Sequence, residues 1–197
     1  MSTHGLFGFC HKNKYYMVFN EYSSYYGDGL GESLLYEIKE MCSNNELELW
    51  IKNFLNLKIV TEKDTPNNED IEYLLRHNID IPSILCTNIA KDWSTILDKF
   101  KGSYKKILDC GHILIDSEYN NEETIGNDST IEYIYVLDFD NMTYNGYFGD
   151  SKPQIIFDLK TRQMMEFDVE PDKTLTEWYH YIDEIQDRYT FPYEPRN

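Results

Sequence analysis

The amino terminus holds the first residues whose types and positions could carry chemistry. Ser2 follows Met1, and removal of Met1 is usual before a small residue, which would leave a free α-amino group beside a hydroxyl. N-terminal-nucleophile hydrolases use such an amine as the base for their own side chain. Thr3 offers the same arrangement only after one further cleavage. Ser2, and less readily Thr3, is therefore a candidate nucleophile for an amide bond, although many proteins without this chemistry also begin with Met-Ser.

Two cysteine–histidine pairs offer ligands that zinc prefers. Cys10 directly precedes His11, and Cys110 lies two residues before His112. Neither pair has the Cys-x-x-Cys spacing of a zinc knuckle, and neighbouring residues of a strand point to opposite faces. The sequence therefore predicts no metal site and no cofactor. A site that joins Cys10 to His112 is the alternative.

The segment Asp138-Phe139-Asp140 resembles the paired carboxylates that hold a divalent ion in sugar-nucleotide transferases. A calcium loop would need an oxygen ligand at position 142 and a glycine after it, but Met142 and Thr143 stand there. Aspartate and asparagine are also typical of a turn that follows a strand. We interpret this segment as a strand end and turn.

A loop rich in tyrosine and glycine is expected over residues 20–29, NEYSSYYGDG. Its glycines have neither the lysine of a P-loop nor the spacing of a dinucleotide-binding motif. Tyrosine supplies contact area and a polar tip, which suits a binding surface as well as packing against a sheet. The candidate binding residues are Asn20, Glu21, Tyr22, Ser24 and Tyr25.

The charge balance narrows the classes of partner. The 197 residues include 35 Asp and Glu against 18 Lys and Arg, for a formal net charge of −17. Such an acidic surface repels phosphate backbones and anionic membranes, so nucleic acid and membranes are not expected partners. It favours a basic protein as partner, and it indicates nothing about the oligomeric state.

The distribution of apolar residues and cysteines predicts a soluble cytoplasmic protein. No stretch approaches the length of a membrane span, and the amino terminus lacks the pattern of a secretion signal. The four cysteines are widely spaced, which favours reduced thiols over a disulfide framework.

The first half of the chain predicts two strands and then several helices. Residues 3–11 are apolar on both faces, which is typical of a strand buried on both sides, and residues 15–19 predict its hairpin partner. Helical stripes follow over residues 30–43, 46–57 and 69–77 and from Trp93 to Phe100.

The second half is dominated by strand patterns. We expect a surface loop at 117–129, a final helix at 175–188, and strands at 106–115, 130–139, 143–148, 154–159 and 163–169. Strands and helices that occur in separate runs indicate an α+β fold of antiparallel hairpins. The prediction is one α+β domain over residues 1–197, with helices outside the sheets. An N-terminal-nucleophile-hydrolase sandwich is one form of this architecture.

Two segments resemble an uncharacterised microbial and fungal family. Its members open with Met-Gly-Thr-Arg-Gly and continue through Tyr-Asn-His-x-Asp-Ser-Tyr-Pro-x-Gly-Leu-Gly into a helix, and Met1 to Gly5 and Phe19 to Gly31 are similar. The stretch from Tyr133 to Asp140 is similar to the family's Tyr-Val-Ile-Asp-Leu-Asp strand. The family has no assigned activity, so the resemblance implies an order of elements and no mechanism.

The chain departs from that family motif where the family carries ionisable groups. Glu21 stands in place of His, Ser23 in place of Asp, and His4 in place of Arg. If these groups were catalytic in relatives, this chain has lost them, which favours a binding role. A single alanine among many Ile, Asn and Tyr residues indicates an AT-rich genome. A giant DNA virus, with the protein in host cytoplasm or virion, fits both observations.

The sequence names no reaction. The leading interpretation is a non-catalytic α+β interaction module that binds a basic protein through residues 20–29. The alternative is an amide hydrolase of the N-terminal-nucleophile type that acts through Ser2 or Thr3.

Overall fold

The computed structural model describes residues 3–27, 29–76, 92–119, 130–148 and 153–166. The chain divides into two units, residues 1–166 and 167–197, and every described residue belongs to the first. The predicted final helix at 175–188 and most of the predicted loop at 117–129 lie outside the described residues.

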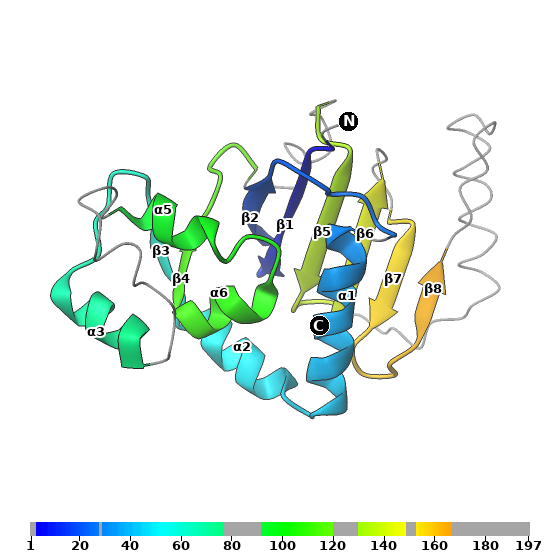
Figure 1. Cartoon of the computed structure of the whole chain (residues 1–197). Coiled ribbons are helices and arrows are strands. Elements are labelled where there is room, and N and C mark those ends of the chain that lie inside the picture. Colours follow the sequence, from blue (N-terminus) through cyan, green and yellow to red (C-terminus); the bar gives the residue numbers. More distant parts are fainter. Residues whose placement is uncertain (1–2, 28, 77–91, 120–129, 149–152, 167–197) are drawn as a thin grey trace. The chain divides into compact units, whose positions relative to one another are not determined.

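A six-stranded mixed sheet forms the centre of the first unit (Figure 1). Its strands run in the order β2-β1-β5-β6-β7-β8. They are β1 (Gly5–His11), β2 (Lys14–Asn20), β5 (Tyr133–Asp138), β6 (Thr143–Phe148), β7 (Ile155–Asp158) and β8 (Met164–Glu166). Strand β1 pairs in parallel with β5, whereas the other neighbours pair antiparallel.

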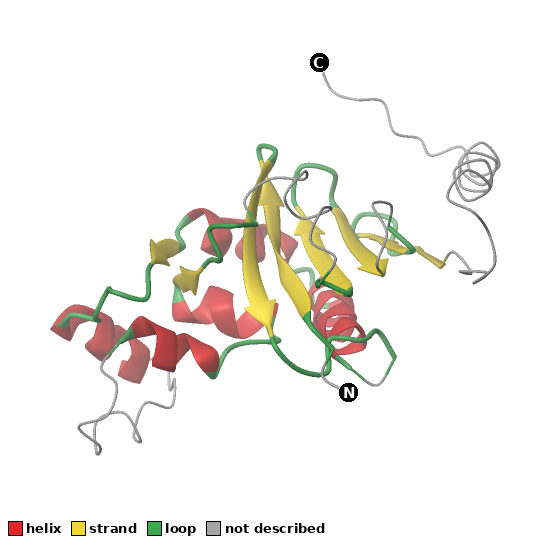
Figure 2. Cartoon of the chain, turned by 90° about the horizontal axis from the view of Figure 1, so that it is seen from above, coloured by secondary structure: helices red, strands yellow, loops and turns green. Residues whose placement is uncertain are grey.

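A separate parallel pair joins β3 (Lys58–Val60) to β4 (His112–Leu114). Both views place this pair on the β2 side of the large sheet, away from β7 and β8 (Figures 1 and 2). The amide of Asp116 donates to the carbonyl oxygen of Met17 at 2.9 Å, which ties the chain after β4 to the edge of β2.

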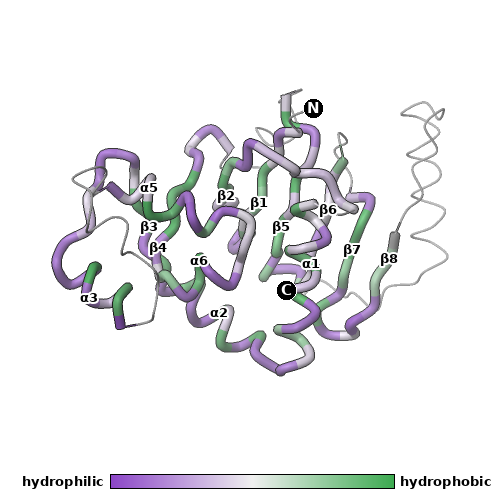
Figure 3. Tube along the Cα trace, in the orientation of Figure 1, coloured by the Kyte–Doolittle hydropathy of each residue, from purple (hydrophilic) through white to green (hydrophobic). Residues whose placement is uncertain are grey.

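The described helices are α1 (Leu30–Ser43), α2 (Leu47–Leu55), α3 (Asn68–Arg76), α5 (Trp93–Asp98) and α6 (Tyr104–Cys110). Apolar side chains of α1, α2, α5 and α6 share one core with one face of the sheet. Figure 3 shows the corresponding contrast, with hydrophobic residues along β5 and β7 and mostly hydrophilic connecting loops. In the part of the chain that the structure describes, no helix has the length and apolarity to cross a membrane.

Strand β1 is buried on both faces, as its sequence predicted. Leu6, Phe7 and Phe9 have no exposed surface. Phe7 and Phe9 enter the core under the helices, whereas Leu6 packs in a second cluster that includes Met17 and Ile134. Burial of apolar groups on alternate sides explains why both sets of positions in this strand are hydrophobic.

The α+β prediction is confirmed. Helix α1 has the predicted bounds, and the hairpins β1–β2, β5–β6 and β7–β8 form where turn residues follow apolar alternation. The hairpin turn at Lys12 and Asn13 has positive φ at both residues, 53° and 56°, which matches the right-handed twist of the flanking strands. The predicted end of β8, at residues 167–169, lies outside the described residues.

The strand predicted over residues 106–115 is confirmed over its last part, β4, and is wrong over residues 106–110. The chain forms helix α6 there and only then the short strand β4. The side chain of Ser103 accepts a hydrogen bond from the amide of Lys106, and Gly111 ends the helix with φ 71°. A serine N-cap and a left-handed glycine are ordinary helix boundaries. The apolar residues between them are equally compatible with a buried strand, which is why the pattern alone predicts a strand.

Candidate functional site

Ser24 anchors the predicted binding loop, residues 20–29, to the sheet. This residue has no exposed surface. Its amide donates to the Thr3 hydroxyl oxygen at 2.9 Å, and its hydroxyl accepts from the Asn20 side-chain amide at 2.8 Å. Because buried polar groups must be paired, these bonds fix the middle of the loop against the residues that precede β1.

Tyr135 of β5 provides a second anchor from 111 residues away. Its hydroxyl donates to the carbonyl oxygen of Ser24 at 2.8 Å, and its side chain is fully buried. The ring passes directly beside Gly31, where a Cβ atom would lie only 2.5 Å from three ring and hydroxyl atoms. The absent side chain at position 31 therefore makes room for this contact.

The end of the loop is bonded to the start of α1. The amide of Leu30 donates to the Ser23 carbonyl at 2.9 Å, and the amide of Gly31 donates to the Tyr25 carbonyl at 3.3 Å. Ser23 adopts a positive φ of 54°, a conformation that needs support from its surroundings. The amides of the first helical turn have no acceptor within the helix, and these two donate to carbonyl oxygens of the loop.

The exposed side chains of the described part of the loop include two tyrosines and a glutamate. Tyr22 is 67% exposed, Tyr25 is 39% exposed, and Glu21 beside them is exposed. Tyr26, the next aromatic residue, is half-buried and packs against Phe148 with ring centroids 5.7 Å apart. Two phenol rings and one carboxylate are groups that suit contact with a cationic side chain.

The structure divides the predicted site residues into two roles. Asn20 and Ser24 hold the loop, whereas Glu21, Tyr22 and Tyr25 form its surface. The candidate nucleophile Ser2 lies outside the described residues, and the hydroxyl of the other candidate, Thr3, accepts the Ser24 amide.

Sequence reasoning missed Tyr135 and Gly31. A glycine in the first turn of a predicted helix was the available signal for a close approach, but nothing local identifies its partner.

Among the described residues, Cys10, Asp138 and Asp140 are the group that could hold a metal ion, with ligand atoms within 4.8 Å of one another. Both carboxylates already accept backbone hydrogen bonds. Asp138 accepts from the amides of Asp140 and Asn141 at 2.9 and 3.0 Å. Asp140 accepts from the amides of the β1–β2 turn, Lys12 at 2.8 Å and Asn13 at 2.9 Å. The arrangement is the expected strand end and turn.

Asp140 is held in its ionised form. Partial burial raises the pKa of its carboxyl, but the amides of Asn13 and Lys12 and the nearby His11 ring outweigh burial, so the pKa lies below the ordinary value. The carboxylate therefore fastens the tip of the β1–β2 hairpin at any physiological pH.

Cys10 and His112 belong to different clusters. Cys10 lies beside Asp140, whereas the His112 ring stacks on Trp93 with centroids 4.0 Å apart. Burial raises the pKa of the other cysteine near His112, Cys110, to about 12, so its thiol stays protonated. A protonated thiol is a poor nucleophile.

His112 borders an open cleft of about 440 Å³ between α3, α2 and β3–β4. Its Nε2 lies 3.5 Å from an Asp70 oxygen, and its Nδ1 lies 3.1 Å from the Cys110 carbonyl oxygen. Burial lowers the pKa of His112, although the Cys110 carbonyl and Asp70 act in the opposite direction.

Asp70 has a structural role at the start of α3. Its carboxylate accepts from the Asn67 amide at 3.1 Å, and its own amide donates to the Asn67 side chain at 2.9 Å. This reciprocal pair is a capping arrangement, which accounts for a buried carboxylate here without a ligand.

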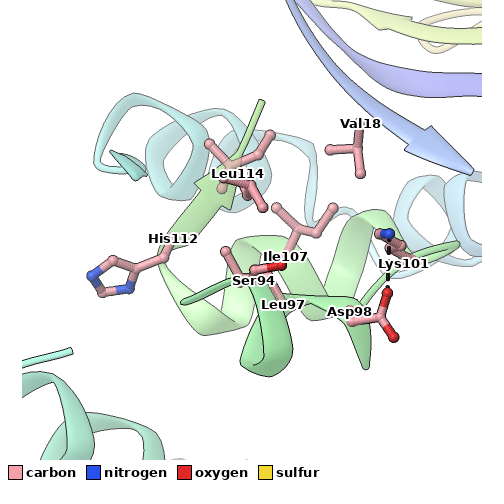
Figure 4. A pocket seen from close by; sticks show the side chains of 9 residues that line it. Val18, Ser94, Leu97, Asp98, Lys101, Ile107, His112 and Leu114 are labelled. Carbon is pink, nitrogen blue, oxygen red and sulfur yellow. Dashed lines mark ion pairs between the residues drawn. The ribbon is translucent and has the colours of Figure 1, made fainter. Parts of the chain in front are cut away.

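A small cavity lies between β2, α5, α6 and β4 (Figure 4). Val18, Leu97, Ile107 and Leu114 turn toward it, and its volume is about 40 Å³. The His112 ring points away from these aliphatic side chains (Figure 4). The space is of the size that holds one or two waters, so it does not fit an organic ligand.

Comparison with known proteins adds no assignment. No family model matches this chain, and no match is found among the curated proteins or the solved structures.

Proposed function

We propose that this protein is a non-catalytic interaction module that binds a basic segment of another protein through Glu21, Tyr22 and Tyr25. The observation that carries the proposal is the contrast within one loop. Ser24 is fully buried and bonded to Thr3, Asn20 and Tyr135, while the tyrosines beside it are exposed.

A loop held in this way has two physical advantages for binding. Tyrosine has few rotatable bonds, and the backbone around Ser24 is fixed before any partner arrives, so little conformational entropy is lost on binding. Exposed phenol rings attract arginine and lysine through cation–π contacts, each contributing about 0.5–1 kcal/mol at such sites.

The charge of the whole chain supports the same class of partner. A net charge of −17 attracts basic proteins at long range and raises their rate of encounter, whereas it repels acidic ones. Binding through this loop should therefore weaken with ionic strength, because exposed charges are screened by salt.

The test is a fluorescence anisotropy titration of the full chain with labelled peptides of equal length that are rich in arginine, lysine or glutamate. We expect the arginine-rich peptide to bind most tightly and the glutamate-rich peptide not to bind. The Tyr22→Ala/Tyr25→Ala variant should lose about tenfold in affinity, since two cation–π contacts are removed.

Two control variants separate the loop from general surface effects. Tyr36 of α1 is 69% exposed, as much as Tyr22, so Tyr36→Ala should leave the affinity within about twofold. Tyr22→Phe/Tyr25→Phe retains the ring faces and should bind like the native chain. Equal losses for the Tyr36 variant and the loop variant would contradict the proposal.

The alternative function, an amide hydrolase with Ser2 or Thr3 as nucleophile, has one observation in its favour. Strand β1 begins two residues after Thr3 and runs through the core, as such a mechanism requires of its first strand. Intact-mass measurement and N-terminal sequencing separate the two functions. A retained Met1 or an acetylated Ser2 removes the amine that this hydrolase needs.

We also infer a distant relationship to the family that the sequence resembles, and from the AT-rich residue usage a viral source. The support is the order of a hairpin, the 20–29 loop, helix α1 and the later hairpin β5–β6, which follows the order of the resembled motifs. The loss of the family's ionisable residues at positions 21 and 23 agrees with binding instead of catalysis.

A further inference from the structure

A groove of about 400 Å³ lies between the β1–β2 hairpin tip and the chain that joins α2 to β3. It is distinct from the 20–29 loop, and its lining joins two kinds of side chain. Its apolar part is formed by Tyr16, Phe54, Leu55, Leu57, Ile59 and Ile113. Its polar part is formed by His11, Lys12 and Lys14.

The floor of the groove is preformed. Phe54 is buried, and its ring lies between 5.0 and 5.8 Å, centroid to centroid, from the rings of Phe139, Phe9, Tyr16 and His11. Rings packed on several sides keep their positions, so an apolar ligand would meet a surface that needs no rearrangement.

The apolar rim is open to solvent. Leu55, the last residue of α2, is 59% exposed, and Ile59 of β3 is also exposed. Leu57 between them is half-buried. Aliphatic side chains that gather around a concave surface favour an apolar ligand, whereas single exposed leucines need no explanation.

The charge of the groove is opposite to that of the chain. Among the described residues, the ionisable side chains that line it are basic apart from the Tyr16 phenol, although acidic residues outnumber basic ones 35 to 18 over the whole sequence. Within the described residues neither Lys12 nor Lys14 forms an ion pair with a carboxylate, and Lys14 Nζ lies over the Tyr16 ring at 5.1 Å. Two ammonium groups are therefore available at one end of an apolar groove.

The carboxylate of Asp140 fixes the backbone of the hairpin tip that carries Lys12. Asp140 accepts the backbone amides of Lys12 and Asn13, and its carboxylate lies 3.3 Å from His11 Nδ1. These contacts engage the backbone of the hairpin tip and the imidazole, so they fix the tip without neutralising the two ammonium groups.

We propose that this groove binds a small amphipathic anion, an aliphatic chain that ends in a single carboxylate or similar head group. The aliphatic chain would lie on Phe54 between Leu55 and Ile59. The head group would pair with Lys12 and Lys14, which act together as flexible point charges.

Calorimetric titration of the full chain with decanoate, decanol and decyltrimethylammonium tests this assignment. We expect decanoate to bind at least about tenfold more tightly than decanol, and the cation to bind most weakly. Lys12→Gln/Lys14→Gln should lower decanoate affinity about tenfold and leave decanol within about twofold. Lys106→Gln/Lys160→Gln removes the same charge from exposed positions outside the groove and should change neither ligand.

The apolar half has its own matched pair of variants on α2. Leu55→Ser should weaken decanoate and decanol alike, whereas Leu49→Ser, at a residue that is 51% exposed and outside the groove, should weaken neither. Equal affinities for decanoate and decanol would overturn the proposal. A decanoate affinity that does not change in Lys12→Gln/Lys14→Gln would overturn it as well. If the native chain forms a dimer and Leu55→Ser is monomeric, the groove is an interface with a second copy of the chain, and this result would also overturn the proposal.

Discussion

Replacing Phe9 by alanine is expected to lower the free energy of unfolding by about 3–5 kcal/mol, the range for removing a buried phenylalanine ring. Phe9 has no exposed surface, and its ring packs 5.1 Å from both Phe54 and Tyr104. The loss combines the transfer free energy of the ring with the cavity that rigid aromatic neighbours cannot fill. Urea denaturation followed by tryptophan fluorescence measures it.

Phe19 is the matched control, because it lies on the neighbouring strand β2 and is only half-buried. Phe19→Ala should cost less than half as much as Phe9→Ala. Equal and small losses for both variants would mean that β1 does not run through the core.

Replacing Gly31 by alanine is the second large effect, and two opposing terms decide its sign. Alanine in place of glycine within a helix favours folding by about 1 kcal/mol. The added Cβ would lie 2.5 Å from the Tyr135 ring, which cannot retreat because it is buried and bonded to Ser24. Overpacking of this kind costs about 1–3 kcal/mol or more, so we expect a net loss of stability by thermal and urea denaturation.

Gly27 of the same loop is the control, since a Cβ there would meet no atom within 4 Å among the described residues beyond its chain neighbours. Gly27→Ala should change stability by less than about 0.5 kcal/mol. The Gly31 variant should also bind the arginine-rich peptide more weakly, because the displaced Tyr135 releases Ser24. Unchanged stability and unchanged binding in Gly31→Ala would contradict the anchoring role of Tyr135.

The sequence predicted those parts of the fold whose cause is local. Alternation in β1 and the stripe of α1 depend on which side of one element is buried, and both appear where they were expected. The error at residues 106–110 was also local. Ser103 and Gly111 carry the helix boundary signals, whereas the apolar residues Ile107 and Leu108 fit a strand as well as a helix.

The remaining features depend on contacts between distant segments. The parallel pairing of β1 with β5 joins residues more than 120 positions apart, and no turn between them predicts this pairing. The same holds for Tyr135 and Ser24, and for the lysines of the β1–β2 turn beside Leu55 and Ile59. Composition identified the tyrosine loop as a candidate, but only the fold separates the residues that hold it from those that face solvent.

Amide hydrogen exchange of the free protein shows whether the loop around Ser24 is fixed before any partner binds. The amides of Ser24 and Leu30 donate to the Thr3 hydroxyl and the Ser23 carbonyl, both at 2.9 Å. We predict that both amides exchange at least about 100-fold more slowly than in an unstructured peptide. Exchange at the rate of an unstructured peptide would show a loop that is not preformed and would contradict the account.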